Sequence, residues 1–162
     1  MNNTSLHIHI DTAKQQLQLL EDEKMLQQYT ISTAKKGLGE RYGSECTPRG
    51  WHIVRAKIGQ GQAVNTVFVG RRPTGECYTP QLRENYPQRD WILTRILWLS
   101  GTEPGRNRLG NVDTMRRYIY IHGCPDEDEM GRPGSHGCIK MRNQEIIALF
   151  DSVSCGTRVY IE

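Results

Sequence analysis

The sequence lacks the long apolar segments of a membrane protein and the basic clusters of a nucleic-acid-binding protein. Hydrophobic residues make up 36% of the 162 residues. The mean hydropathy is −0.63, and no stretch approaches the ~20 consecutive apolar residues that span a bilayer. The net charge is +3 and no basic run exceeds two residues, a pattern too weak and dispersed for nucleic-acid binding. We therefore expect neither a membrane nor a nucleic acid as a partner.

The chain also shows no secretory leader and no disulfide framework. Residues 1–11 lack the basic and apolar regions of a signal peptide and instead alternate between polar and apolar side chains. The five cysteines are odd in number and have no recurring disulfide spacing, which favours reduced thiols. These features predict a cytoplasmic protein, or a periplasmic one if the natural chain carries a leader upstream of this sequence.

Most of the sequence has the patterning of β-strands. Leu6, Ile8 and Ile10 alternate with two histidines, as in a strand with one buried face. Further strands are expected at residues 15–20, 25–32, 51–58, 63–70, 90–100, 117–121 and 157–161, the last of them closing the sheet. Residues 144–151 form the clearest helix, and residues 71–88 are irregular. The pattern predicts a single mostly β domain over residues 1–162, a sandwich or barrel.

The most informative stretch is residues 118–141, which reads YIYIHGCPDEDEMGRPGSHGCIKM. His122 and Gly123 end a predicted strand, and the Pro- and Gly-rich segment 125–134 is a loop that can return His136, Gly137 and Cys138 beside His122. A thiol near an imidazole is suited to nucleophilic attack on a carbonyl, with the imidazole moving the proton. Gly137 leaves room beside the thiol, so that backbone N–H groups there are candidates to bind an oxyanion.

Three interpretations of this stretch remain open on the residues alone. Cys138 is a buried core thiol in the first, because cysteine is among the most buried residue types. In the second, His122, Cys124, His136 and Cys138 hold a structural zinc, although the usual Cys-x2–4-Cys spacing is absent. The third is a cysteine enzyme, in which an imidazolium lowers the pKa of the nucleophilic thiol. We favour the enzyme, because it alone accounts for the glycine and both histidines around Cys138.

A resemblance supports that choice. The segments SHGCIKM, IHG, CGTRVYI, CTPRGWHIV and LHIHIDTAKQQLQLL, spread over almost the whole chain, resemble the L,D-transpeptidase catalytic (YkuD) family. The resemblance implies a β-sandwich of mixed sheets with one or two short helices. It also implies Cys138 as nucleophile, His122 as base steadied by the Gly123 carbonyl, and His136 and Gly137 lining the oxyanion site. This sequence departs from the family pattern with Lys140 in place of an arginine and Cys124 in place of a threonine.

The resemblance also implies a substrate. Family members act on peptidoglycan stem peptides that carry diaminopimelate, react with carbapenem-type inhibitors, and need no cofactor or metal. Lys140, Arg142 and Ser135 are the candidate substrate-binding residues, the two cations for a substrate carboxylate. The acidic run at residues 126–129 is either a solvated face or a site for the diaminopimelate ammonium.

The expected function is an L,D-carboxypeptidase that removes terminal D-alanine from tetrapeptide stems through a thioester on Cys138, in cytoplasmic muropeptide recycling. The expectation rests on the missing leader, since the resemblance implies that leaderless members trim stems with water as the acyl acceptor. An L,D-transpeptidase that forms peptidoglycan cross-links is the first alternative. A structural zinc-binding module is the second.

Overall fold

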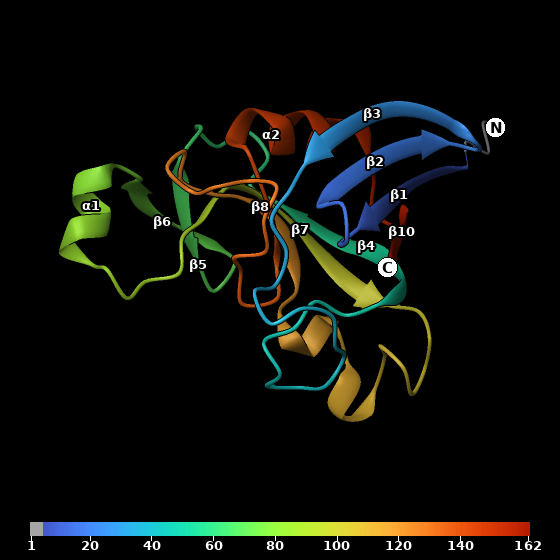
Figure 1. The fold of residues 1–162 in the computed structure, drawn as a ribbon. Coiled ribbons are helices and arrows are strands. Elements are labelled where there is room, and N and C mark those ends of the chain that lie inside the picture. The colour runs from blue at the N-terminus through green and yellow to red at the C-terminus, as the bar shows by residue number, and fades with distance from the viewer. Residues whose placement is uncertain (1–4) are drawn as a thin grey trace.

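The computed structural model describes residues 5–162, so residues 1–4 of the segment in which we sought a leader lie outside the described residues. The predicted mostly β fold with mixed strand pairing and two short helices is confirmed (Figure 1). Its elements are β1 (Leu6–Asp11), β2 (Gln16–Glu21), β3 (Lys24–Thr30), β4 (Gly50–Ile58), β5 (Thr66–Val69), β6 (Arg72–Cys77), α1 (Pro80–Asn85), β7 (Ile92–Gly101), η1 (Gly110–Val112), η2 (Met115–Arg117), β8 (Tyr120–Gly123), β9 (Ile139–Met141), α2 (Asn143–Ser152) and β10 (Arg158–Ile161).

The strands hydrogen-bond in the order β3-β2-β1-β10-β4-β7-β5-β6, and β8 pairs with both β7 and β9. The alternation at the start of the chain forms an antiparallel β1–β2–β3 meander, with Ile8 and Ile10 fully buried. β10 was expected to close the sheet, but it lies inside, parallel to β1 and antiparallel to β4. Insertion between two strands pairs both edges of β10, so the end of the chain is held inside the sheet.

Residues 71–88, expected to be irregular, contain the strand β6 and the helix α1. Gly70 and Arg71 both have positive φ, at 56° and 64°, and form the tight turn between β5 and β6. α1 begins where the Thr79 hydroxyl accepts a hydrogen bond from the Leu82 N–H at 3.1 Å, with Pro80 in the first turn. A threonine cap followed by proline is a helix-start signal that was present in the sequence.

The strand expected over residues 117–121 begins later, at Tyr120. The preceding residues form the short turn η2, which ends at Tyr118 in the left-handed conformation with φ 56°. The Tyr118 carbonyl and the Tyr120 N–H, which follow this turn, both contact the Cys138 sulfur.

β8 and β9 lie parallel, with His122 in register with Lys140, and α2 packs on β8 and β7. The inward face of α2 consists of Ile146, Leu149 and Phe150, all fully buried. Asn143 at the helix start donates to the Cys124 carbonyl at 2.9 Å, which attaches the helix to the end of β8. Within the described residues, no helix is both long and apolar enough to cross a membrane.

Candidate active site

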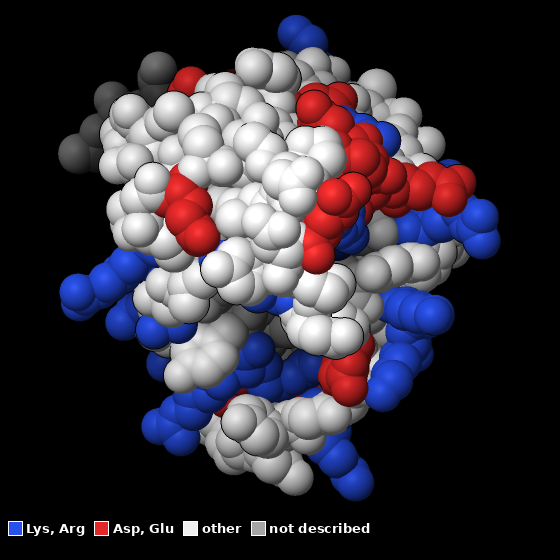
Figure 2. Space-filling view, turned by 90° about the vertical axis from the view of Figure 1, so that its left-hand side faces the viewer, with Lys and Arg blue, Asp and Glu red and all other residues white. Residues whose placement is uncertain are grey.

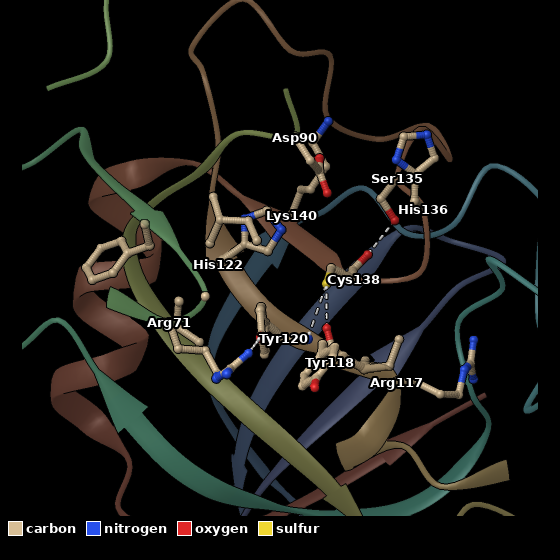
Figure 3. Close-up of a pocket in the computed structure, with 15 residues that line it drawn as sticks. Arg71, Asp90, Arg117, Tyr118, Tyr120, His122, Ser135, His136, Cys138 and Lys140 are labelled. Atoms are coloured by element: carbon tan, nitrogen blue, oxygen red, sulfur yellow. Dashed lines mark hydrogen bonds between the residues drawn. The ribbon is translucent and has the colours of Figure 1, made fainter. Parts of the chain in front are cut away.

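Cys138 and His122 line one cavity of about 430 Å³. The cavity is formed by residues from the β5–β6 turn, β7, η2, β8 and the β8–β9 loop. Its lining is Phe68, Gly70, Arg71, Asp90, Ile92, Ile96, Arg117, Tyr118, Ile119, Tyr120, His122, Ser135, His136, Cys138 and Lys140. Figure 3 shows the Cys138 sulfur between the His122 ring on one side and the backbone of Tyr118 and Tyr120 on the other. The loop therefore returns the thiol to the histidine, as the sequence predicts.

His122 is held by its own strand end. Its Nδ1 lies 2.6 Å from the Gly123 carbonyl oxygen, so Nδ1 carries the proton and Nε2 is the atom left to accept one. The side chain is buried, and burial lowers the pKa of His122, against the opposing effects of the Gly123 hydrogen bond and of the Asp90 charge. The resting ring is therefore neutral at physiological pH.

The Cys138 thiol lies between two backbone groups. It donates to the Tyr118 carbonyl at 3.4 Å, and the Tyr120 N–H donates to the sulfur at 3.3 Å. Burial raises the pKa of Cys138 to about 12, with the Tyr120 N–H and the Arg117 charge opposing the rise. Burial therefore opposes the expected thiolate–imidazolium pair in the unliganded protein, because it penalises both ions.

The turn that carries Cys138 is fixed by hydrogen bonds within it and to a neighbouring loop. Ser135 Oγ donates to the Cys138 carbonyl at 2.5 Å and accepts from the Gly137 N–H at 3.2 Å. Thr47 Oγ1 donates to the Gly137 carbonyl at 2.9 Å. Ser135 is thus a structural residue of the turn, rather than the free substrate-binding hydroxyl we expected. The Gly137 N–H is likewise already engaged and does not face an oxyanion in this state.

Gly137 itself is required by the backbone. Its φ is 130°, and a Cβ there would lie 3.1 Å from the Ile119 side chain and 3.2 Å from the Cys46 carbonyl oxygen. The absence of a side chain at Gly137 therefore lets the turn pack against the loop that carries Cys46 and Thr47.

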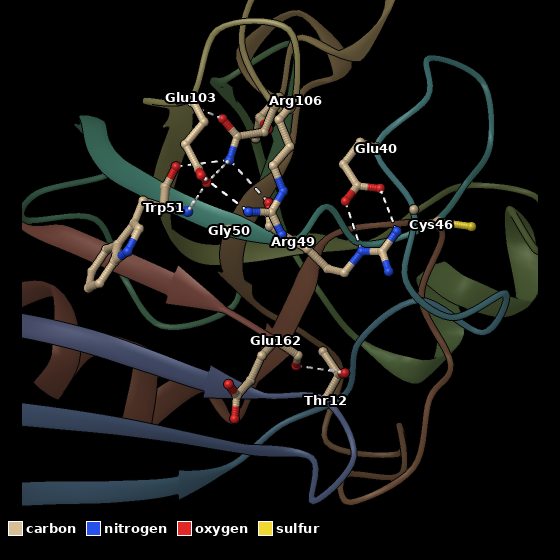
Figure 4. Close-up of polar contacts among 12 residues, drawn as sticks. Thr12, Glu40, Cys46, Arg49, Gly50, Trp51, Glu103, Arg106 and Glu162 are labelled. Carbon is tan, nitrogen blue, oxygen red and sulfur yellow. Dashed lines mark hydrogen bonds and ion pairs between the residues drawn. The ribbon is translucent and has the colours of Figure 1, made fainter.

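A polar network fixes that neighbouring loop (Figure 4). Arg49 pairs with both carboxylate oxygens of Glu40 at 2.8 and 3.1 Å. The Glu103 carboxylate accepts from the Trp51 N–H at 2.7 Å, passing over Gly50, where φ is 96°. The segment after Thr47 is thus fixed at Arg49 by Glu40 and at Trp51 by Glu103.

Lys140 and Arg142, the two cations expected to bind a substrate carboxylate, both contact other groups of the protein. Lys140 lines the cavity, but its ammonium is paired with Asp128, which also receives Arg83 at 2.8 Å. Arg142 is outside the cavity lining and donates to a backbone carbonyl of the acidic run at 2.9 Å. Asp128 therefore links α1 to β9 through Arg83 and Lys140. It is neither a solvated surface charge nor free to bind the diaminopimelate ammonium. His136, in contrast, exposes its ring at the cavity rim.

The four proposed zinc ligands do not converge. The Cys124 thiol is buried and donates to the Met141 carbonyl at 3.3 Å, and the pKa of this thiol is raised to about 12 by burial. His136 is exposed at the rim, away from that thiol. No group of three or more metal-binding side chains occurs anywhere in residues 5–162. The geometry therefore offers no support for the zinc interpretation.

Sequence reasoning missed several residues of the cavity. They are Arg71, Asp90, Arg117, Tyr118 and Tyr120. Arg117, Tyr118 and Tyr120 directly precede His122, and their position in the strand-like run was the available signal. Arg71 and Asp90 lie far from His122 in sequence. Arg71 begins the long segment 71–88, whose length was the available signal of a functional loop, and no pattern points to Asp90.

Comparison with known proteins decides the family. The sequence model of the L,D-transpeptidase catalytic domain, YkuD, matches residues 5–161. The chain belongs to this family. It is 31% identical over 133 residues to ErfK/SrfK of Escherichia coli K12, named as a probable L,D-transpeptidase, which covers 82% of this chain and 37% of that protein. The L,D-transpeptidases are a cysteine-dependent enzyme family.

Solved L,D-transpeptidases share the fold at low identity. An L,D-transpeptidase from Mycobacterium smegmatis superposes with a TM-score of 0.59 at 18% identity, over 98% of this chain and 59% of the other. The L,D-transpeptidase LdtMt1, solved in complex with imipenem, superposes with a TM-score of 0.59 at 17% identity, over 98% and 59% of the two chains. The chain thus spans less than two thirds of the length of these relatives.

Proposed function

We propose that the protein cleaves the peptide bond between diaminopimelate and terminal D-alanine in peptidoglycan tetrapeptide stems. The observation that supports this proposal most directly is the shared cavity of Cys138 and His122, in which the Gly123 carbonyl leaves His122 Nε2 as the proton acceptor. The substrate class follows from membership of the L,D-transpeptidase family.

Cys138 attacks the carbonyl carbon at the L-centre of diaminopimelate while His122 Nε2 takes the thiol proton. The new S–C bond gives a tetrahedral intermediate. Its collapse breaks the C–N bond, and His122 returns the proton to the departing amine of D-alanine, leaving a thioester on Cys138. The Tyr120 N–H, 3.3 Å from the sulfur, stabilises the negative charge on sulfur as the proton leaves.

Water is the proposed acceptor of the acyl group, which makes the protein an L,D-carboxypeptidase. His122 takes a proton from water as the water oxygen adds to the thioester carbonyl. The S–C bond then breaks, and His122 returns the proton to the sulfur to restore the thiol. The five free cysteines, two of them exposed, suit a reducing cytoplasm, where stems are met as dispersed fragments during muropeptide recycling. An amine acceptor outcompetes water only when it is bound and oriented, an effect worth about 7–11 kcal/mol at best.

Mass spectrometry of products from a purified tetrapeptide muropeptide tests this proposal. The expected products are tripeptide muropeptide and free D-alanine, with no cross-linked dimer even when a second stem is supplied as acceptor. Cys138→Ala should abolish turnover, while Cys124→Ala should keep most of it, because the Cys124 thiol points to Met141. A dimer as the main product would establish the transpeptidase alternative instead.

A further inference from the structure

The cavity lining contains three cations that differ in what they contact. Arg117 donates to two backbone carbonyls and a serine hydroxyl at distances of 2.6–3.2 Å. Lys140 is paired with Asp128. Among residues 5–162, Arg71 has no carboxylate partner, and its one hydrogen bond runs from Nη1 to the Tyr120 hydroxyl at 3.1 Å. Within the described residues Arg117 lacks a carboxylate partner as well, but three protein groups already accept its donors. Arg71 is therefore the cavity cation with the most N–H donors left free for a ligand.

Arg71 is nevertheless held in one place. It occupies the second position of the β5–β6 turn with φ 64°, a conformation that is uncommon for a residue with a side chain. Its guanidinium carbon lies 4.9 Å from the Trp98 ring centroid and 4.8 Å from that of Tyr118. Two cation–π contacts and a hydrogen bond orient the guanidinium before any ligand arrives, which lowers the entropy lost on binding.

Tyr120 connects this guanidinium to the nucleophile. Its backbone N–H contacts the Cys138 sulfur, and its hydroxyl accepts from Arg71. The guanidinium is thus about one tyrosine side chain away from the reacting thiol. Asp90, the carboxylate of the cavity lining, lies on the opposite side of Cys138 in Figure 3 and does not neutralise Arg71.

The donors that Arg71 keeps free match one ligand chemistry. A guanidinium presents five N–H donors in a planar fork that fits a carboxylate bidentately, and one of them is used by Tyr120. Figure 2 shows Lys and Arg side chains in and around a hollow in the lower part of the face, and Asp and Glu side chains grouped above it, so an anionic ligand is attracted to the hollow rather than to the whole face.

We propose that Arg71 binds a free carboxylate of the acyl donor while Cys138 attacks the carbonyl carbon of the scissile bond. The inference rests on the proposed function, because it assigns the charged group recognised in the same cavity. Each of the two residues joined by the scissile bond supplies a candidate: the C-terminal carboxylate of D-alanine and the side-chain carboxylate of diaminopimelate. Arg71 is a binding residue and takes no part in proton transfer.

The test compares three tetrapeptides, one unmodified, one with a C-terminal carboxamide and one with an amidated diaminopimelate side chain. They are assayed with the wild-type protein, Arg71→Met, Arg71→Lys and the control Arg72→Met. Arg72 is the exposed next residue on β6 and lies outside the cavity lining. We expect one amidated peptide to lose about 10–100-fold in kcat/KM with the wild-type protein. Arg71→Met should lose the same factor in kcat/KM on the unmodified peptide and should cleave the unmodified and that amidated peptide equally well. Arg72→Met should behave as the wild-type protein.

Binding to Cys138→Ala, measured by calorimetry, separates this inference from the proposed function. Unmodified tetrapeptide should bind Cys138→Ala more tightly than Cys138→Ala/Arg71→Met by the same factor, and both proteins should keep their thermal midpoints. If peptides are cleaved but neither amidation nor Arg71→Met changes kcat/KM, the Arg71 assignment fails and the function stands. If no peptide is cleaved but binding depends on Arg71 and one carboxylate, the function fails and the assignment stands.

Discussion

The neutral state of the resting Cys138–His122 pair predicts a specific pH dependence for alkylation by iodoacetamide. Only the thiolate reacts, so the rate follows the thiolate fraction. With the pKa of Cys138 raised to about 12 by burial, the thiolate fraction at pH 8 is roughly one in 10,000. The alkylation rate should therefore rise about tenfold per pH unit from pH 6 to pH 10, without a plateau.

Peptide mass spectrometry measures this rate at Cys138, with the exposed Cys77 and Cys155 in the same digest as references for reagent activity. His122→Gln should change the rate at Cys138 by less than about threefold, because burial, rather than a charged imidazole, sets the thiol pKa. The same variant should lose turnover, since it lacks the proton acceptor. A rate plateau near neutral pH, or a large fall in His122→Gln, would show a resting thiolate–imidazolium pair and refute this reasoning.

Three further predictions concern the same turn and cavity. Gly137→Ala should destabilise the protein by about 1–3 kcal/mol, seen as a lower calorimetric Tm, because it adds a close contact to a strained φ; Gly156→Ala, also at positive φ but with open space around it, should cost less. Asp90→Asn should lower the pKa of Cys138 and speed its alkylation at fixed pH, because the Asp90 charge opposes the thiolate; an unchanged rate contradicts this. Imipenem should add its mass to intact protein at Cys138, because the thiol proposed to attack the peptide carbonyl can also attack the carbonyl of the β-lactam ring; a label on Cys124 would reverse the roles of the two thiols.

The fold class was predictable because it depends on patterns local to each strand. The alternation at Leu6, Ile8 and Ile10 appears directly as a strand with its apolar face in the core. The position of β10 was not predictable in this way, since strand order depends on which edges remain free after the other strands have paired. The capping signal at Thr79 and Pro80 was visible, but the many loop-forming residues around it outweighed it.

The shared cavity of His122 and Cys138 was predictable because the His122-Gly123 and Gly137-Cys138 pairs carry their own local signal. The roles of their neighbours depend on long-range contacts instead. Ser135 is a polar residue beside the thiol in sequence, yet its hydroxyl is used by the turn. Lys140 is well placed in sequence for a carboxylate, yet it is paired with Asp128 from the intervening loop. Arg71 enters the site through a hairpin that no pattern near Cys138 indicates.

The cost of burying charge determines both the resting state of the thiol and the effect of a carboxylate bound to Arg71. Two opposite charges buried side by side in an unliganded cavity lose hydration that their attraction only partly repays, so a neutral pair is the more stable resting state. A neutral thiol also does not repel a carboxylate that approaches the cavity. If Arg71 binds that carboxylate, the net positive charge near the sulfur falls as the substrate enters. The Arg71 charge then no longer favours ionisation of the Cys138 thiol before the attack. Proton transfer to His122 must then accompany the attack on the carbonyl, which makes the fixed orientation of the His122 ring by Gly123 a requirement of the chemistry.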